Sequence, residues 1–287
     1  MITVEYRIDN TFEAPTKEEW EKYLGGSSLF NNMLINSDGF KVAEDIMTEL
    51  LFNQGIREYI RVHNNKVGVL NISYVLSRHY FDKGIPDDQW YISPGKKGSS
   101  IEYMPNFQEA DWLVHYWFSY HCEAVYYKLF SIWDSVVGFI NEYYQMGYKD
   151  DYRFRINVMK ELKKNRSDIE NLMKSILEEK IYKDANMYRT NIVHGTPPSE
   201  VSGFIRLERD VDSEAPDRDE NGKIKTDKKG IVMMKKVKNK MCISGCAGEY
   251  TKAKTIMDNI DEFCLFTGEK IEQIMTLIKE DQFYLKR

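Results

Sequence analysis

Two residues near the end of an expected helix carry side chains suited to cleaving a phosphodiester. Arg189 and His194 are separated by four residues in the segment Arg-Thr-Asn-Ile-Val-His. An imidazole gains and loses a proton near neutral pH, so His194 could act as a general acid or base. A guanidinium is a permanent cation whose paired donors match phosphate oxygens, so Arg189 could stabilise charge on a phosphoryl group. The pair therefore combines a group that can transfer a proton with a group that can bind a phosphate oxygen.

The element that positions this pair is predicted to be one long helix that begins at Ser167. Its apolar residues recur every three or four positions: Ile169, Met173, Leu177, Ile181, Ala185, Tyr188 and Ile192. Ser167 and Glu170 have capping-box spacing at its start. Gly195 is placed to end it as a left-handed cap, and the prolines that follow cannot continue it. At this C-terminal end the helix dipole favours the protonated form of His194.

Composition places the chain among globular proteins. Its 287 residues can bury a sizeable core, and 42% are hydrophobic and 30% charged. A formal charge of -5 argues against an overall nucleic-acid-binding field but not against a local basic cleft. The N-terminus lacks a signal-peptide pattern, and no apolar run approaches the roughly 18 residues of a membrane span. These features favour a cytoplasmic protein without a membrane segment.

Four cysteines show no spacing typical of a disulfide framework or a zinc site: Cys122, Cys242, Cys246 and Cys264. We therefore expect packed, reduced thiols. No other residue pattern indicates a metal site or a cofactor. His115 and His121 have no partner at metal-ligand spacing, so we expect them to be core histidines.

Residues 1–105 are predicted to form a small mixed α/β region, packed on the rest of the chain or separate from it. The expected elements are a half-exposed strand over 1–10, a short helix over 16–24, an amphipathic helix over 39–60, a segment over 67–80 that fits a strand or a helix, and a Gly- and Pro-rich loop over 82–105. Thr16 and Glu19 have capping-box spacing, and Gly55 is a candidate break in the amphipathic helix.

Residues 106–287 are predicted to be a mostly α bundle. The longest helical segment, 106–146, is apolar or aromatic on nearly all sides, as is typical of the central helix of a bundle. A short basic helix over 152–164, the motif helix and a final helix over about 250–283 complete it.

An insertion over about 199–248 interrupts this bundle. Its middle is dense in charged residues and glycine, and its flanks, 203–207 and 231–234, could pair as a hairpin, with disorder at the tip an equal alternative. Lys235, Lys236 and Lys238 follow directly after the second flank, within the insertion. They could follow RNA phosphates or form a solvated face.

Arg189-Thr-Asn-Ile-Val-His194 resembles the Arg-x4-6-His motif of the HEPN superfamily, and the resemblance covers about residues 106–285. It implies a bundle of four to five core helices in which the motif closes one helix. In this superfamily two copies usually face each other across a homodimer, and many members are metal-independent endoribonucleases. Several are toxins or antiviral effectors. An RNA substrate, a second copy of the chain and an antitoxin or other protein are therefore the implied partners.

The resemblance also implies roles for individual residues. Arg189, His194 and the intervening Asn191 are the candidate catalytic residues of the motif. Members tend to place an acidic residue on an earlier helix, and Glu123 is the candidate because it interrupts the apolar surface of the central helix. Asp134, eleven residues on, shares that face.

Geometry constrains how the pair can act together. Five residues at about 100° each place Arg189 and His194 about 140° apart on a regular helix. They share a site only if the last turn unwinds toward Gly195 or if a partner subunit supplies one of them. This favours a composite site across a homodimer.

Two hypotheses follow. One is a dimeric endoribonuclease, favoured by the intact Arg189 and His194. The other is a non-catalytic helical module that dimerises and binds RNA, nucleotide or a protein. It is favoured by Thr190, where the family commonly has Asn, Asp or His, and by Thr196, where toxin-like members often have Tyr. In the second case Arg189 could simply pair with a core carboxylate.

Overall fold

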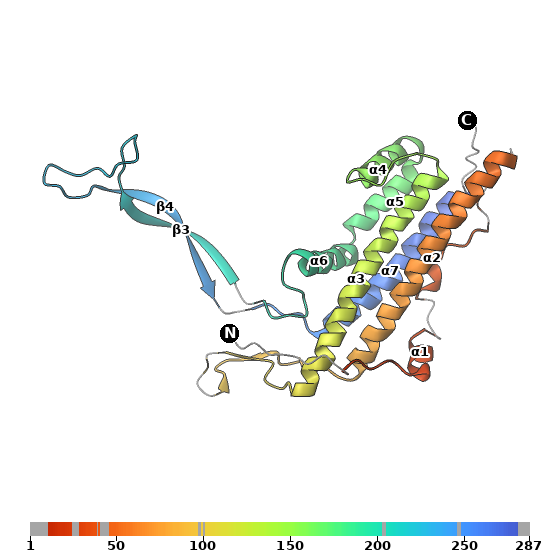
Figure 1. Cartoon of the computed structure of the whole chain (residues 1–287), viewed down its shortest axis with the longest axis horizontal. Coiled ribbons are helices and arrows are strands. Elements are labelled where there is room, and N and C mark those ends of the chain that lie inside the picture. Colours follow the sequence, from red (N-terminus) through yellow and green to blue (C-terminus); the bar gives the residue numbers. More distant parts are fainter. Residues whose placement is uncertain are drawn as a thin grey trace. The chain divides into compact units, whose positions relative to one another are not determined.

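The computed structural model describes residues 11–24, 29–38, 40, 46–96, 99, 101–202, 205–245 and 248–280 (Figure 1). The strand expected within residues 1–10 lies outside this part. The chain divides into two compact units, Met1–Ser199 with Thr251–Arg287 and, separately, Glu200–Tyr250. The second unit coincides closely with the expected insertion. The two are described in turn.

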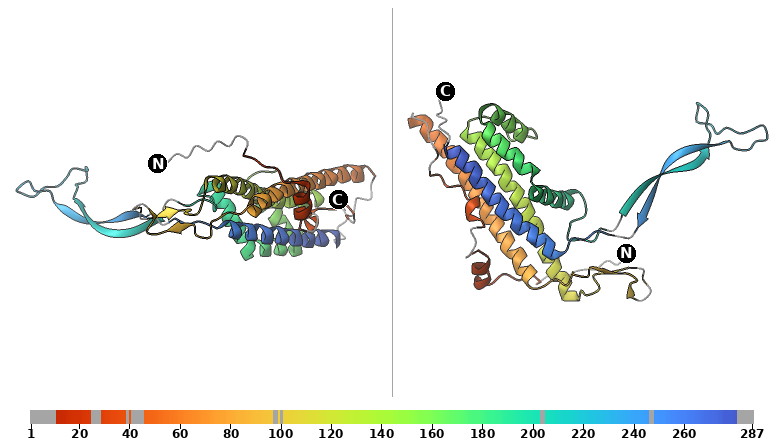
Figure 2. Two further views of the ribbon diagram at one scale, coloured as in Figure 1. Left: turned by 90° about the horizontal axis from the view of Figure 1, so that it is seen from below. Right: turned by 180° about the vertical axis from the view of Figure 1, so that it is seen from behind.

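Three long helices lie side by side in the first unit: α2 (Ile46–Asp82), α3 (Glu109–Tyr143) and α7 (Ala253–Glu280) (Figures 1 and 2). The predicted mostly α class is confirmed. α3 begins with a capping box in which the Gln108 backbone N–H donates to Asp111 Oδ2 over 2.8 Å. No helix of the described part is long and apolar enough to cross a bilayer.

α2 is one continuous helix of 37 residues, so the break expected at Gly55 is wrong, and the ambiguous segment 67–80 is helical. The glycine serves close packing instead. A Cβ at Gly55 would lie 2.5 Å from Glu142 Oε1 of α3, and one at Gly138 of α3 would lie 3.0 Å from the Tyr59 ring of α2. Glycine on each helix thus makes room for a side chain of the other.

Three shorter helices complete this unit: α4 (Phe154–Asn165), α5 (Ser167–Glu178) and α6 (Lys180–His194). α4 and α6 contact α3, whereas α5 contacts α7. The single long motif helix predicted from the apolar period is therefore wrong. Glu179, with φ -62° and ψ 137°, leaves the helical region and separates α5 from α6. The expected capping box of Ser167 is also absent, because Arg166 is the N-cap residue and Ser167 is the first residue of the helix. The Arg166 carbonyl accepts the Glu170 N–H over 3.1 Å. The apolar period runs across the break because both helices bury one face in the same core.

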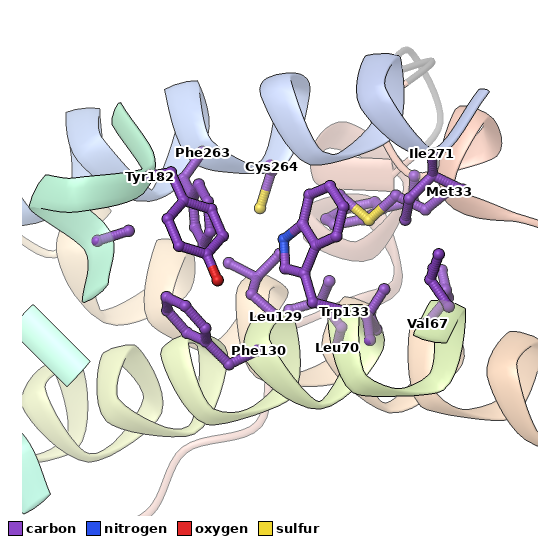
Figure 3. Packing of buried hydrophobic residues seen from close by; sticks show 14 of the residues in the cluster. Met33, Val67, Leu70, Leu129, Phe130, Trp133, Tyr182, Phe263, Cys264 and Ile271 are labelled. Atoms are coloured by element: carbon purple, nitrogen blue, oxygen red, sulfur yellow. The ribbon is translucent and has the colours of Figure 1, made fainter. Parts of the chain in front are cut away.

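Aromatic residues of three helices meet in the core (Figure 3). Phe130 of α3 and Phe263 of α7 have ring centroids 5.5 Å apart, and Tyr182 of α6 packs on both, at 5.5 and 6.0 Å. Cys122 and Cys264 are free, buried thiols, as expected, and burial raises the pKa of the Cys122 thiol. The side chains of the other two cysteines lie outside the described residues.

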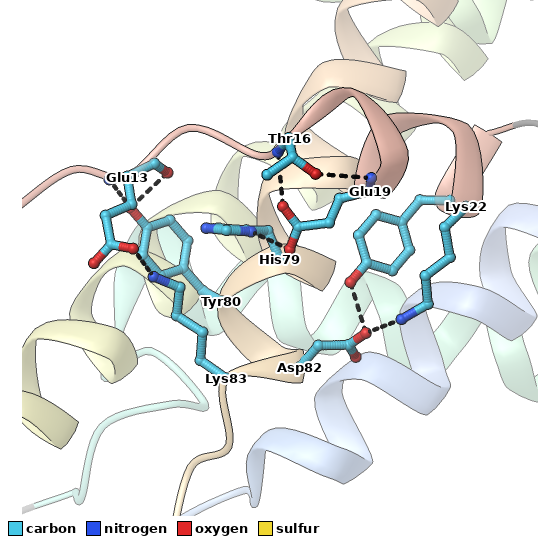
Figure 4. A network of polar contacts seen from close by, with 9 residues as sticks. Glu13, Thr16, Glu19, Lys22, His79, Tyr80, Asp82 and Lys83 are labelled. Carbon is cyan, nitrogen blue, oxygen red and sulfur yellow. Dashed lines mark hydrogen bonds and ion pairs between the residues drawn. The ribbon is translucent and has the colours of Figure 1, made fainter.

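The N-terminal segment is tied to the end of α2 (Figure 4). The predicted capping box opens α1 (Lys17–Leu24): the Thr16 N–H donates to Glu19 Oε2 over 2.7 Å, and the Glu19 N–H donates to Thr16 Oγ1 over 3.2 Å. Glu19 also contacts His79 Nδ1 at 2.9 Å, and Lys22 pairs with Asp82 at 2.6 Å. The first compact unit therefore includes residues on both sides of position 105, where the domain boundary was expected.

The second unit is an antiparallel hairpin of β3 (Ile205–Pro216) and β4 (Met234–Gly245). A hairpin was expected, but with 203–207 opposite 231–234. The strands are longer than that, so Ile205 lies opposite Gly245. Residues 217–233 at the tip form two similar turns. Asp219 Oδ1 accepts two backbone N–H bonds in the first turn, and Asp227 Oδ1 accepts two in the second.

His121 is a core histidine, as expected, and it is only 6% exposed. Its ring stacks on Tyr80 at 5.9 Å and on Trp117 at 6.0 Å, and its Nε2 is buried without a hydrogen-bond partner. Burial and the nearby His79 lower the pKa of His121 to about 4. His115 is also buried, as expected, and burial lowers its pKa as well.

The buried His121 predicts an acid-sensitive fold. The folded pKa is about 4 and an unfolded imidazole titrates near pH 6.5, so the unfolded chain binds more protons between these values. The stabilisation by neutral His121 is thus complete above about pH 6.5 and declines as the pH falls, by roughly 2 kcal/mol at pH 5. Urea unfolding from pH 8 to pH 5 should show a smaller decline for His121→Phe, which keeps the stacked ring. An equal decline in both proteins would contradict this assignment.

Candidate functional site

Aromatic contacts place α6 against α3 and the start of α7. Tyr182 and Ala185 are buried, and the Tyr188 ring lies 5.7 Å from that of Tyr126 on α3. Tyr188 is also hydrogen-bonded to the side chain of Thr251, just before α7. These contacts hold the first half and the middle of α6 and thereby fix which of its faces remain exposed.

α6 stays helical through its last turn. The Gly195 N–H donates to the Asn191 carbonyl over 2.8 Å, so the i to i-4 bonding continues to the end. Gly195 has φ -139°, so the left-handed cap expected there is wrong. The chain instead leaves the helix in an extended conformation. Of the two ways to bring Arg189 and His194 together, unwinding of the last turn is therefore not observed.

Arg189 is half-buried and held by packing. Its guanidinium carbon lies 4.7 Å from the centre of the Phe130 ring, and Nη2 donates to Asn186 Oδ1 over 3.1 Å. Nε is buried without an acceptor. Within the described residues no carboxylate pairs with Arg189, so the alternative of an ion pair with Glu123 or Asp134 does not hold.

His194 and Asn191 occupy a different face of α6. Both are exposed, and with Met187 they are spaced three and four residues apart, which aligns them on one side. Thr190 is also exposed, and its hydroxyl donates to the Asn186 carbonyl over 2.7 Å. One subunit therefore presents the arginine and the histidine of the motif on separate faces of one regular helix.

A family model described as Cthe2314-like HEPN matches residues 59–261. The chain belongs to this HEPN family. No curated protein and no solved structure matches the chain. The match begins within α2, whereas the sequence resemblance was placed over about 106–285, so the matched region also includes residues 59–82 of α2.

The other predicted HEPN site residues lie on α3. Glu123 is half-buried and precedes Phe130 by seven residues, so it lies on the side of α3 that meets Arg189, two turns away. Asp134 is exposed. No three His, Cys, Asp or Glu side chains of the described chain gather as metal ligands.

Apolar side chains are exposed on α6, which carries the motif, and on α3, which packs against it. Tyr127 of α3 is 41% exposed, and Met187 and Val193 of α6 are 50% and 48% exposed. We call these three residues the motif patch for their shared exposure, although Met187 and Val193 lie about 120° apart around α6. Scattered exposed apolar residues are common on proteins, but these flank the only motif that the sequence singled out.

The predicted RNA-binding lysines belong to the hairpin unit. The register places Lys236 opposite Glu214 and Lys238 opposite Asp212. Lys235 lies 3.6 Å from Asp217. Each lysine therefore has a carboxylate beside or opposite it, as in stabilising cross-strand ion pairs.

The unpaired Nε predicts that Arg189 contributes little to stability. Arg189→Met should leave the free energy of unfolding within about 1 kcal/mol, because loss of the ring contact is offset by removal of a buried donor without an acceptor. Arg166 is the matched control, since it pairs with Asp168 at 2.7 Å and donates to the Leu277 carbonyl over 2.9 Å. Arg166→Met should lose about 1–3 kcal/mol in urea unfolding at the same protein concentration, mainly because the Leu277 carbonyl loses its donor. Equal losses would make Arg189 a structural residue.

Proposed function

We propose that this HEPN protein is a metal-independent endoribonuclease whose active site combines Arg189 of one subunit with His194 of a second. The regular helix through His194 supports this most directly, because it keeps the two side chains on separate faces of one subunit. A two-fold axis beside α6 would bring the histidine face of one copy to the arginine face of the other. Family membership supports a nuclease or nucleotide-binding module.

The surroundings of Arg189 suit phosphate binding, and those of His194 suit proton transfer. Arg189 has a buried donor without an acceptor, and phosphate oxygens are acceptors that a guanidinium binds well. His194 is exposed, so it can reach a bound substrate. In the proposed reaction the 2'-oxygen attacks phosphorus and loses its proton, and the bond from phosphorus to the 5'-oxygen breaks. His194 protonates that leaving oxygen.

Two further residues have supporting roles in this proposal. Asn191 is one turn from His194 on the same face, where its amide can hold a phosphate oxygen or the ribose. Glu123 is the candidate acceptor for the 2'-hydroxyl proton, from the side of α3 that meets α6. Lys235, Lys236 and Lys238 remain predicted RNA contacts, although the facing carboxylates weaken the field of the hairpin.

A non-catalytic module that dimerises and binds RNA, nucleotide or a protein is the alternative. Thr190 favours it, because its hydroxyl is engaged with the Asn186 carbonyl rather than presented as a strong polar group. A role in defence or as a toxin, with an antitoxin partner, belongs to the first proposal.

The first experiment tests catalysis. The purified full chain is incubated with structured RNA in EDTA, beside His194→Ala and Arg189→Ala. We expect cleavage by the wild type and a loss of at least about 100-fold in each variant, since a general acid contributes roughly that much. Arg153→Ala, which removes an exposed arginine before α4, should cleave normally. A wild type that binds RNA without cleaving it would favour the non-catalytic module.

A mixing experiment tests the composite site. Arg189→Ala and His194→Ala are each inactive alone, but a mixed dimer retains one complete site when the residues come from different subunits. Equal mixing after exchange of subunits should restore about a quarter of wild-type activity, because about half of the dimers are mixed and each has one of two sites. A site within one subunit predicts no recovery at all.

The motif patch predicts the surface through which the copies meet. Val193→Glu places a charge on it and should shift the chain from dimer to monomer in light scattering, with cleavage lost in parallel. Leu265→Glu is the matched control, because Leu265 of α7 is also 48% exposed but lies outside the patch. A Val193→Glu protein that stays dimeric and active would exclude this interface.

A further inference from the structure

An open hollow of about 620 Å³ lies at the end of the bundle where α7 begins. Its walls are residues 88–93, which follow α2 and include β1 (Tyr91–Ile92), together with Lys252. All of them belong to the first compact unit. The lining of this hollow includes neither a residue of the motif nor a residue of the hydrophobic core.

Two aromatic rings line the hollow. Tyr91 is 47% exposed, and its ring centroid lies 4.6 Å from that of Trp90. Trp90 is backed by Tyr103 of β2 (Glu102–Tyr103), whose ring is nearly parallel to it, at 5° and 6.1 Å. The Trp90 carbonyl also accepts the Met104 N–H over 2.8 Å. The exposed Tyr91 ring therefore packs against Trp90, which Tyr103 holds in place. A ring held in this way can serve as a stacking surface for a base.

A lysine side chain, Lys252, also lines this hollow. Lys252 precedes the first residue of α7, whose N-terminal end carries the positive end of the helix dipole. Its Nζ lies 3.9 Å from Asp88 Oδ1, but Asp88 is fully exposed and such a surface pair contributes little. Lys252 is therefore available to an anion that binds beside the rings.

Hydrogen bonds connect the hollow to the chain that leaves the motif. The Thr251 N–H donates to the Pro198 carbonyl over 2.8 Å, and the Ala253 N–H donates to Asp87 Oδ2 over 2.6 Å. Pro198 follows His194 by four residues, which span at most about 14 Å. A ligand of a few nucleotides could therefore occupy the hollow and reach His194 of the same subunit.

We propose that this hollow is a subsite for single-stranded RNA, in which a base stacks on Tyr91 and the adjacent phosphate binds Lys252. The inference rests on the proposed function and deepens it, because it makes an unpaired strand beside the scissile bond the substrate class. An exposed ring on a braced aromatic base, joined to one cation, is how proteins hold unpaired bases without reading their identity.

The experiment measures binding of a fluorescent, unstructured RNA to the full chain in the His194→Ala background, where cleavage does not interfere. Tyr91→Ala should weaken binding about tenfold, and Tyr91→Phe, which keeps a ring, should not. Lys252→Gln should reduce the slope of log affinity against log salt by about 0.7. Asp88→Asn should strengthen binding. Tyr152→Ala is the matched control, because Tyr152 is 85% exposed far along the sequence, before α4, and should bind like the parent.

An abasic RNA of the same length separates stacking from charge. It should bind the Tyr91→Ala protein and its parent equally, but should still respond to Lys252→Gln. If wild type cleaves RNA and Tyr91→Ala binds with unchanged affinity, this inference is wrong and the proposed function stands. If the wild-type chain neither binds nor cleaves RNA, both are wrong. Thermal melts of each variant exclude misfolding as the cause of a loss.

Discussion

The packing of α3 between its neighbours is the constraint on which the rest of this HEPN domain depends. Glycines on α2 and α3 let these helices approach closely, with Glu142 over Gly55 and Tyr59 over Gly138. α7 closes the same core through Phe263. With these faces of α3 occupied, α6 meets the Phe130 side, and that contact decides which of its own faces are buried. The motif is thereby divided, with Arg189 against a ring and His194 in solvent.

The helices of the domain could be predicted where one physical signal dominates. The apolar pattern of α3 and the Thr16–Glu19 box depend on local spacing, and both were found in the structure. The continuity of α2 could not be predicted, because Gly55 lowers helix propensity locally while its role is to accommodate Glu142 on another helix. The break between α5 and α6 at Glu179 could not be predicted either, because the apolar spacing continues across it. Apolar spacing records which residues are buried, and it does not change when two helices share one core.

The sequence predicted which residues form the candidate site, but not which groups surround them. The spacing of Arg189 and His194 and the family resemblance identified the motif helix. Sequence could not show that Phe130, rather than a carboxylate, contacts Arg189, because such a contact depends on the crossing of α6 and α3. The hairpin lysines illustrate the same limit. Their clustering along the sequence suggests a basic surface, but the register sets Lys236 opposite Glu214 and Lys238 opposite Asp212. Opposite charges across a strand pair stabilise the hairpin and reduce its attraction for an anion.

Arg189, on the buried side of the motif, has an Nε donor without an acceptor. A buried N–H without an acceptor costs about 1–3 kcal/mol, and folded proteins leave few of them. Arg166, by contrast, has a carboxylate, a carbonyl and the Tyr144 hydroxyl as acceptors. A structural role for Arg189 would favour the same solution, and Glu123 lies on the adjoining side of α3. The structure instead holds the guanidinium on a ring, which positions the cation without neutralising it. In the proposed function, the acceptor for this donor arrives with a substrate or a second subunit. An unpaired buried atom alone does not mark a binding group, because Trp133 Nε1 and His121 Nε2 also lack a partner.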